Sequence, residues 1–167
     1  MTNATRLLRV VRLDDSDTQV YERAAAPGEW AVPGTFHFWD LPVDALQGKT
    51  RQAFAHGFLG LSSFGRATLV AVAPITPAEL EAAAECLAAH LVEAFGAPNL
   101  AAALPAAREE IAFAAELCQH PPNTLVAVAR QLDGDDIDEQ FKVVTPPSGA
   151  NHDAIALFGV VDDDQAP

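Results

Sequence analysis

The most constraining part of the sequence is an alanine-rich segment, residues 76–120, whose pattern predicts two long helices joined by a short connection. At its start Thr76 offers a hydroxyl N-cap, Pro77 fits the first helical position, and Glu79 completes a capping box. Gly96 fits the left-handed position that ends a helix. Apolar residues recur between these signals at spacings of three and four, which predicts a buried stripe of Leu80, Ala84, Leu87, Leu91 and Phe95.

Pro105 constrains the second helix. Proline inside a helix removes a hydrogen bond and clashes with the preceding turn, so we predict a start near Leu104 with Pro105 in the first position. Pro121 forces the chain out of the helix after His120. The predicted buried stripe of this helix consists of Ala107, Ile111, Ala114 and Cys118.

Strand-like segments flank the helical pair. We predict strands at 7–13, 18–23, 35–39, 67–73, 124–132 and 137–143, and a short helix at 49–58. Asp133 and Gly134 mark a turn between the last two strands. Strands grouped as hairpins, with helices kept apart from them, are typical of an α+β fold in which an antiparallel or mixed sheet carries the helical hairpin on one face.

The chain length suits one domain, which we place at residues 1–145. A proline- and glycine-containing linker follows. Residues 146–167 then comprise this linker, a candidate edge strand at 154–160 and an acidic end.

Charge limits the partners of this chain. Ten Lys and Arg against 23 Asp and Glu give a net charge of −13, which repels the phosphates of nucleic acids and anionic membrane surfaces. No stretch of about 18 uncharged apolar residues is present, so we expect no membrane-spanning helix. Cys86 and Cys118 both fall on predicted apolar helix faces, which fits a reducing compartment and indicates a cytoplasmic protein.

The first hypothesis for function is a non-enzymatic accessory or binding protein that acts through oligomer or partner contacts, because the sequence holds no reinforced catalytic set. Its motivating feature is the glycine-rich segment 57–65, where large apolar residues stand in a predicted loop. The candidate interface residues are Phe58, Leu61 and Phe64.

The second hypothesis is a small-molecule-binding domain or enzyme with a pocket between the aromatic strand 35–39 and the loop 57–66. His37 alternates with its two phenylalanine neighbours and therefore shares a strand face with Thr35 and Trp39. The candidate lining residues are His37, Trp39, Ser62, Ser63 and Arg66.

The third hypothesis is a metal-handling protein that uses Cys86 and His90, which share a helix face at a spacing of four. If the helices are antiparallel, Cys118 lies about 14 Å further along the pair, too far to complete a four-ligand site with them. The sequence therefore assigns no cofactor.

Several short segments stand out together: Pro27-Gly28-Glu29-Trp30-Ala31-Val32-Pro33-Gly34, then Arg51-Gln52-Ala53-Phe54 with Gly57-Phe58-Leu59-Gly60, and His120-Pro121-Pro122. With them the chain resembles a small family of uncharacterised bacterial proteins, and the resemblance covers most of the chain. What it implies is a bacterial cytoplasmic protein without an assigned activity, associated with gene clusters for molybdenum-type oxidoreductases. From this association follows the expectation that the accessory role supports a metalloenzyme system.

Overall fold

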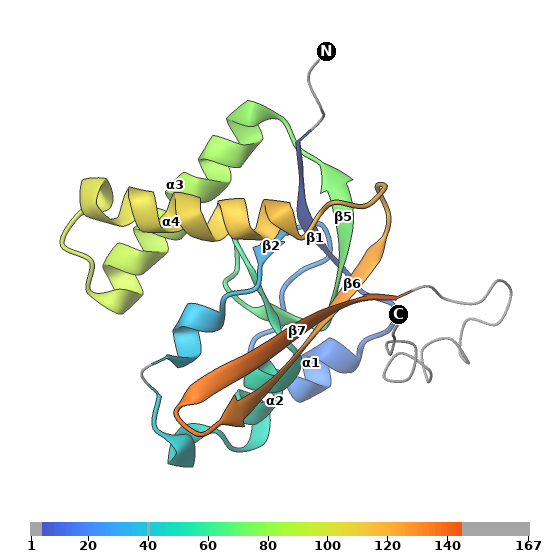
Figure 1. Ribbon diagram of the computed structural model, residues 1–167, viewed down its shortest axis with the longest axis vertical. Helices are drawn as coiled ribbons and strands as arrows, with labels where there is room; N and C mark the ends of the chain where they lie inside the picture. Colours follow the sequence, from blue (N-terminus) through green and yellow to red (C-terminus); the bar gives the residue numbers. More distant parts are fainter. Residues whose placement is uncertain (1–4, 40, 145–167) are drawn as a thin grey trace, which may run out of the picture.

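One antiparallel sheet of seven strands runs through the computed structural model, which describes residues 5–39 and 41–144 (Figure 1). Its strand order is β4-β3-β2-β1-β5-β6-β7. The strands are β1 Arg6–Val11, β2 Trp30–Val32, β3 Phe58–Gly60, β4 Arg66–Ala67, β5 Leu69–Pro74, β6 Leu125–Asp133 and β7 Asp136–Val144. The predicted α+β fold with an antiparallel sheet is confirmed.

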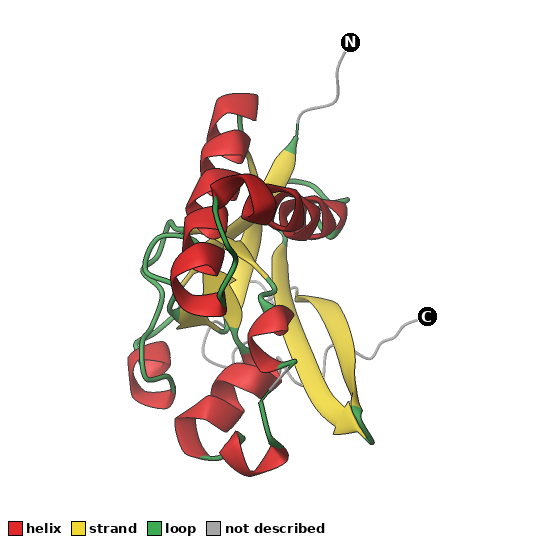
Figure 2. Ribbon diagram, turned by 90° about the vertical axis from the view of Figure 1, so that its left-hand side faces the viewer, coloured by secondary structure: helices red, strands yellow, loops and turns green. Residues whose placement is uncertain are grey.

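The helices gather on one side of the sheet, as Figure 2 shows for α3 and α4. The α-helices are α1 Ser16–Val20, α2 Gly48–His56, α3 Pro77–Phe95 and α4 Leu100–Glu116, and two short 3-10 helices are η1 Thr35–Phe38 and η2 Val43–Ala45. The main core lies between the helical pair and the central strands, where Leu7, Val70 and Leu87 are fully buried. A second, smaller core joins η1 to α2 through Phe38, Leu46 and Phe54.

The start and end of α3 are as predicted. The Thr76 hydroxyl accepts a hydrogen bond from the Glu79 N–H at 3.1 Å, the Glu79 carboxylate accepts from the Thr76 N–H at 3.0 Å, and Gly96 is left-handed with φ 77°. The buried face is shifted from the predicted stripe, because alanines pack closest to the sheet while Phe95 is 44% exposed. The buried residues are Ala83, Ala84, Leu87 and Ala88.

The predicted start of α4 is wrong. The helix begins at Leu100 and contains Pro105, because the Asn99 side chain caps it by accepting a hydrogen bond from the Ala102 N–H at 2.8 Å. Burial of Ala103 before the proline and of Ile111 after it offsets the one backbone bond that proline removes. The predicted stripe of α4 is buried throughout, Cys118 included.

The connection between α3 and α4 turns the chain through 117°, so the helices cross rather than run antiparallel. Among the described residues no single helix is long and apolar enough to cross a membrane, whereas these two together pass that test by length and composition alone.

Two predicted strands are wrong. Residues 18–23 overlap α1, which is held by buried Asp17: its carboxylate accepts hydrogen bonds from the Thr68 N–H at 3.2 Å and hydroxyl at 2.7 Å. The aromatic segment 35–39 forms η1 instead, because Gly34 turns the chain with φ 70° and the tertiary contacts of Phe38 outweigh strand propensity.

The other predicted strands and the short helix are present with shifted ends, whereas the predicted loop 57–65 contains a strand, β3. The short helix α2 ends at His56, so that Phe58 belongs to β3, and the run 67–73 is divided between β4 and β5. β6 and β7 form the predicted hairpin, with φ 65° at Gly134. The predicted edge strand 154–160 and the acidic end lie outside the described residues.

Candidate functional site

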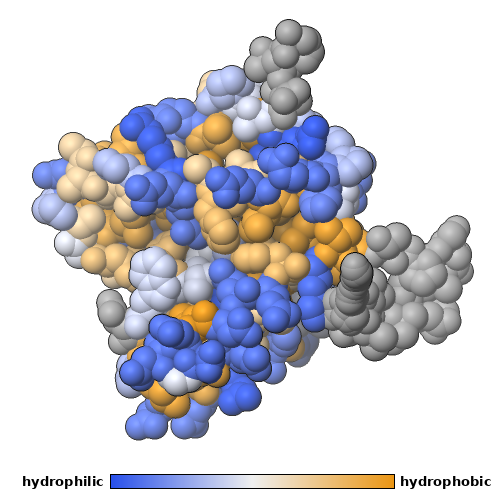
Figure 3. Space-filling model, viewed as in Figure 1, coloured by the Kyte–Doolittle hydropathy of each residue, from blue (hydrophilic) through white to orange (hydrophobic). Residues whose placement is uncertain are grey.

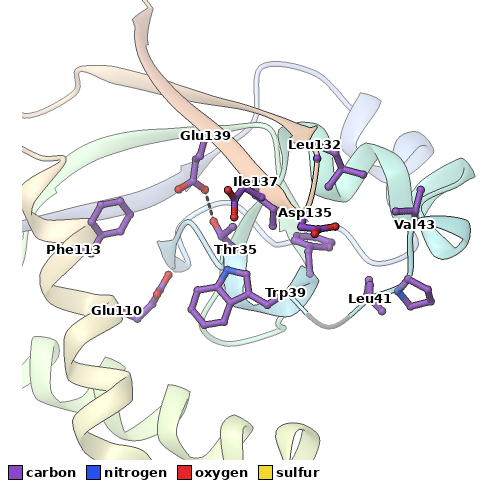
Figure 4. A pocket seen from close by; sticks show the side chains of 14 residues that line it. Thr35, Trp39, Leu41, Val43, Glu110, Phe113, Leu132, Asp135, Ile137 and Glu139 are labelled. Carbon is purple, nitrogen blue, oxygen red and sulfur yellow. Dashed lines mark hydrogen bonds between the residues drawn. The ribbon is translucent and has the colours of Figure 1, made fainter.

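A groove of about 830 Å³ opens between η1, α4 and the β6–β7 hairpin (Figure 4). Side chains from α4 and from β7 enter it from opposite sides, with Trp39 between them. Its lining consists of Thr35, Phe38, Trp39, Leu41, Pro42, Val43, Glu110, Phe113, Leu132, Gly134, Asp135, Asp136, Ile137 and Glu139.

Exposed apolar side chains concentrate at this groove. Nine large hydrophobic residues are exposed in the described part of the chain, and five of them line it. Trp39 is 69% exposed and Val43 65%, values that leave most of each side chain in water. The other three are Leu41, Phe113 and Leu132. Figure 3 shows apolar surface interrupted by hydrophilic patches on this face of the molecule.

Carboxylates supply the polar part of the groove. Glu110 accepts a hydrogen bond from the Gly34 N–H at 3.1 Å, which holds α4 against the turn before η1. Burial raises the pKa of the Glu110 carboxyl, and the negative charge of Glu139 raises it further. Asp135 and Asp136 line the hairpin end of the same groove. The groove therefore combines an apolar rim with negative charge.

Arg130 and Glu139 form the buried ion pair beneath the groove. The Arg130 Nε donates to the Glu139 Oε2 at 2.7 Å, and the two side chains are 0% and 18% exposed. The Thr35 hydroxyl also donates to Glu139 (Figure 4). Arg130 further donates to the backbone oxygens of Pro33 at 2.6 Å, Phe54 at 2.8 Å and Gly57 at 3.0 Å.

Arg66 binds at the same junction, where the end of α2 meets the turn before η1. It is 6% exposed and donates to the backbone oxygens of Gly57 at 3.1 Å and Gly34 at 3.1 Å. Its guanidinium carbon lies 4.7 Å from the centre of the Phe38 ring, and that of Arg130 lies 5.7 Å from it. Burial and the neighbouring Arg130 charge lower the pKa of Arg66. Together the two arginines tie the end of α2 to η1, and so position Thr35 and Trp39 at the groove.

The predicted pocket residues separate in the structure. Trp39 lines the groove, whereas Arg66 lies beneath it with its donors turned to backbone oxygens. Ser62 and Ser63 lie in the turn after β3, where their N–H groups donate to the Glu29 carboxylate at 3.0 and 2.9 Å. Because the far wall of the groove is α4 and the hairpin, the loop 57–66 does not line it.

His37 belongs to a separate aromatic cluster on the other side of η1. Its Nε2 lies 3.4 Å from the Nε2 of His90, while the ring centres are 5.5 Å apart, so the two nitrogens face each other. Phe64, in a left-handed conformation with φ 57°, stacks on His90 with ring centres 3.8 Å apart. Phe95 packs against His37 with ring centres 4.7 Å apart.

The structure gives His90 a different neighbour from the one the sequence suggested. Cys86 is exposed and lines a groove with Trp30 and Ser62, and neither His37 nor His90 is part of that lining. Within residues 5–39 and 41–144, no three His, Cys, Asp or Glu side chains come together as a metal site. Cys118 is buried, which raises the pKa of its thiol to about 12.

The His37–His90 cluster makes an acid-sensitive contact. Burial, Arg66 and His90 lower the pKa of His37 from 6.5 to about 3, so the folded protein resists a proton that the unfolded chain accepts. Stability should therefore fall as the pH drops below about 6.5, before most carboxylates titrate. We expect urea midpoints measured at about pH 7 and pH 5 to differ less for His37→Gln than for the natural sequence. The His120→Gln variant is the control, and an unchanged pH dependence in His37→Gln would contradict the assignment.

Two of the three candidate interface residues are inside the molecule. Phe58 is 0% exposed and Leu61 is 4% exposed, and both belong to the main core. Phe64 is partly buried by its stacking on His90.

Four residues at or beneath the groove are not among the candidates predicted from the sequence: Glu110, Phe113, Arg130 and Glu139. The signals for some of them were present. Glu110 stands three and four residues from Ala107 and Ala114, so it shares their helix face. Arg130 continues the alternation of Val126 and Val128, which predicts an inward side chain. Its pairing with Glu139 depends on the observed register, in which the turn residues are Gly134 and Asp135.

Comparison with known proteins places the chain in a family. The model of a family of unknown function matches residues 5–163. The chain belongs to DUF6505. This confirms the expectation of a family without an assigned activity. No curated protein and no solved structure matches this DUF6505 chain.

Proposed function

We propose that this protein is a non-enzymatic binding protein whose groove takes a segment of a partner protein that carries both apolar and basic side chains. The observation that supports it is the concentration of five exposed hydrophobic residues and four carboxylates in one groove. Clusters of exposed apolar side chains that are bordered by charged residues are typical of protein interaction sites.

Charge complementarity selects the partner. The groove carries Glu110, Asp135, Asp136 and Glu139, of which Glu139 is already paired with Arg130, and the chain has a net charge of −13. A lysine or arginine that reaches Glu110 would stabilise its ionised form, so the bound carboxyl has a lower pKa than the free one. Affinity should therefore rise with pH through the titration of Glu110.

The second candidate is a small cationic ligand with an apolar body. The groove volume of about 830 Å³ falls within the range of about 300–1,000 Å³ typical of ligand pockets. The exposure of Trp39 and Val43 favours the protein partner, because an occupant must span the whole rim to cover both. An anionic ligand held by Arg66 is disfavoured, since that side chain is buried beneath an acidic groove.

An accessory role in the bacterial cytoplasm, as the family resemblance implies, accords with this proposal. A protein that supports a metalloenzyme system would use the groove to recruit its partner. Self-association through the same groove would bring like charges together and is the less favourable use of it.

A selection from displayed random dodecapeptides tests the proposal. We expect the enriched peptides to combine apolar residues with lysine or arginine and to lose at least about tenfold in affinity for the Trp39→Ala and Glu110→Gln proteins. Glu110→Gln retains an acceptor for the Gly34 N–H and removes a charge that burial disfavours, so its folded stability at neutral pH should not fall.

The controls are Leu13→Ala, another exposed hydrophobic residue, and Glu81→Gln, an exposed carboxylate on α3. Neither should change peptide affinity. Enriched peptides that bind all four variants equally, or the lack of any enrichment, would overturn the proposed function. If a small amine competes for the groove and peptides do not, the second candidate function, binding of a small cationic ligand, is favoured instead.

A further inference from the structure

The two edges of the sheet differ in how they are covered. At one edge β4 has only two residues, and the segment before β2 bonds to it: the Ala25 N–H donates to the Arg66 oxygen at 2.9 Å, and the Arg66 N–H donates to the Arg23 oxygen at 2.8 Å. At the other edge β7 has nine residues. Within residues 5–39 and 41–144, no strand pairs with the outer side of β7.

The register of the hairpin identifies the backbone groups on that outer side. Asp133 pairs with Asp136 across a two-residue turn, so this pair exchanges backbone hydrogen bonds. Hydrogen-bonded and non-bonded pairs then alternate along an antiparallel ladder. The residues of β7 whose N–H and C=O groups point outward are therefore Ile137, Glu139, Phe141 and Val143.

The outward-facing backbone and the groove belong to one surface. Ile137 and Glu139 line the groove, and Phe141 continues the same strand face, with its ring centre 5.9 Å from that of Phe113 on α4. A strand placed beside β7 would direct alternate side chains toward this face, over Glu110 and Phe113.

We propose that the partner segment binds as an extended strand added to β7, with every second side chain in the groove; this rests on the proposed function. Backbone hydrogen bonds to the edge give affinity, and the groove gives specificity. The inward positions follow from cross-strand neighbours: an apolar residue opposite Ile137, a basic residue opposite Glu139 and close to Glu110, and an apolar residue opposite Phe141. The recognised pattern is apolar-x-basic-x-apolar.

The probe is an acetylated and amidated heptapeptide, Thr-Val-Thr-Arg-Thr-Val-Thr, followed by amide hydrogen exchange in an NMR experiment on the full chain. With saturating peptide, we expect exchange to slow at the amides of Ile137, Glu139, Phe141 and Val143, whereas their neighbours on β7 already bond to β6. N-methylation of the central arginine amide should weaken binding at least about tenfold, because that N–H faces β7. N-methylation of a threonine next to it is the matched control and should have little effect.

The outcomes separate this inference from the proposed function. Peptides that bind the groove without slowing exchange at these four amides would overturn strand addition but not the proposed groove. The same holds if their affinity does not depend on the position of the methyl group. Failure of the heptapeptide when displayed peptides bind overturns the recognised pattern, and failure of both overturns the function as well. If these four amides already exchange slowly without peptide, the edge is occupied by another part of this chain or by a second copy, and the inference is overturned. Dilution distinguishes the two cases, because only occupation by a second copy depends on protein concentration.

Discussion

Replacement of Arg130 by methionine should destabilise the protein by about 3–5 kcal/mol, since it removes one partner of a buried ion pair. The side chain has no exposed surface and donates to Glu139, Thr35 and the backbone oxygens at 33, 54 and 57. Its loss leaves the partly buried Glu139 carboxylate and several backbone carbonyl groups without their donor. The measurement is urea unfolding followed by circular dichroism, in which the midpoint should fall with little change in slope.

Arg108→Met is the matched control. Arg108 pairs with Glu81 at 2.6 Å, but the two side chains are 54% and 44% exposed, so the urea midpoint should change little. If Arg130→Met does not fold, Arg130→Lys retains a charge but fewer donors, and should fold with reduced stability. Equal midpoints for Arg130→Met and Arg108→Met would contradict the role assigned to this junction.

Replacement of Phe58 by alanine should cost about 3–5 kcal/mol, as expected for a large aromatic residue deleted from a core. Phe58 is 0% exposed, and its ring centre lies 6.3 Å from that of Phe141, which also packs against Phe113 at the groove. The same urea unfolding experiment measures the loss. The mass of the particle in solution should stay unchanged, because the side chain does not reach the surface.

Phe95→Ala is the control for Phe58→Ala, because it removes the same type of side chain from an exposed position. Phe95 is 44% exposed, so its removal should cost about 1 kcal/mol. A change in oligomeric mass with little loss of stability in Phe58→Ala would instead make this residue part of an interface and contradict its place in the core.

The groove could be predicted only in part. Trp39 was identified as a site residue, but the assumed strand placed it next to His37 and the loop 57–66. In η1 the chain turns within each three residues, so His37 faces His90 while Trp39 faces the hairpin. The other wall comes from Glu110 and Phe113, separated from Trp39 by about seventy residues of sequence. No local pattern shows that these segments meet.

Local chemistry in the sequence determined several elements of this protein. The capping box at Thr76, the glycine after α3 and the turn at Gly134 each act through bonds between near neighbours in the chain, and the structure has all of them. The apolar run of β5 marks a buried strand by its composition, although its partners β1 and β6 are distant in sequence. The antiparallel α+β architecture followed from the order of these elements.

Only the tertiary structure decided the course of residues 33–39 and the start of α4. Strand propensity in the aromatic segment is worth less than the contacts that Arg66 and Arg130 make with the backbone at Pro33 and Gly34 and with the Phe38 ring. The cost of Pro105 inside a helix is likewise smaller than the stability gained from the Asn99 cap and the burial of Ala103. In the first case contacts between distant residues outweigh a local preference, and a sequence read locally does not contain their energies. In the second case the cap is local, three residues from its partner, and only the burial of Ala103 depends on distant residues.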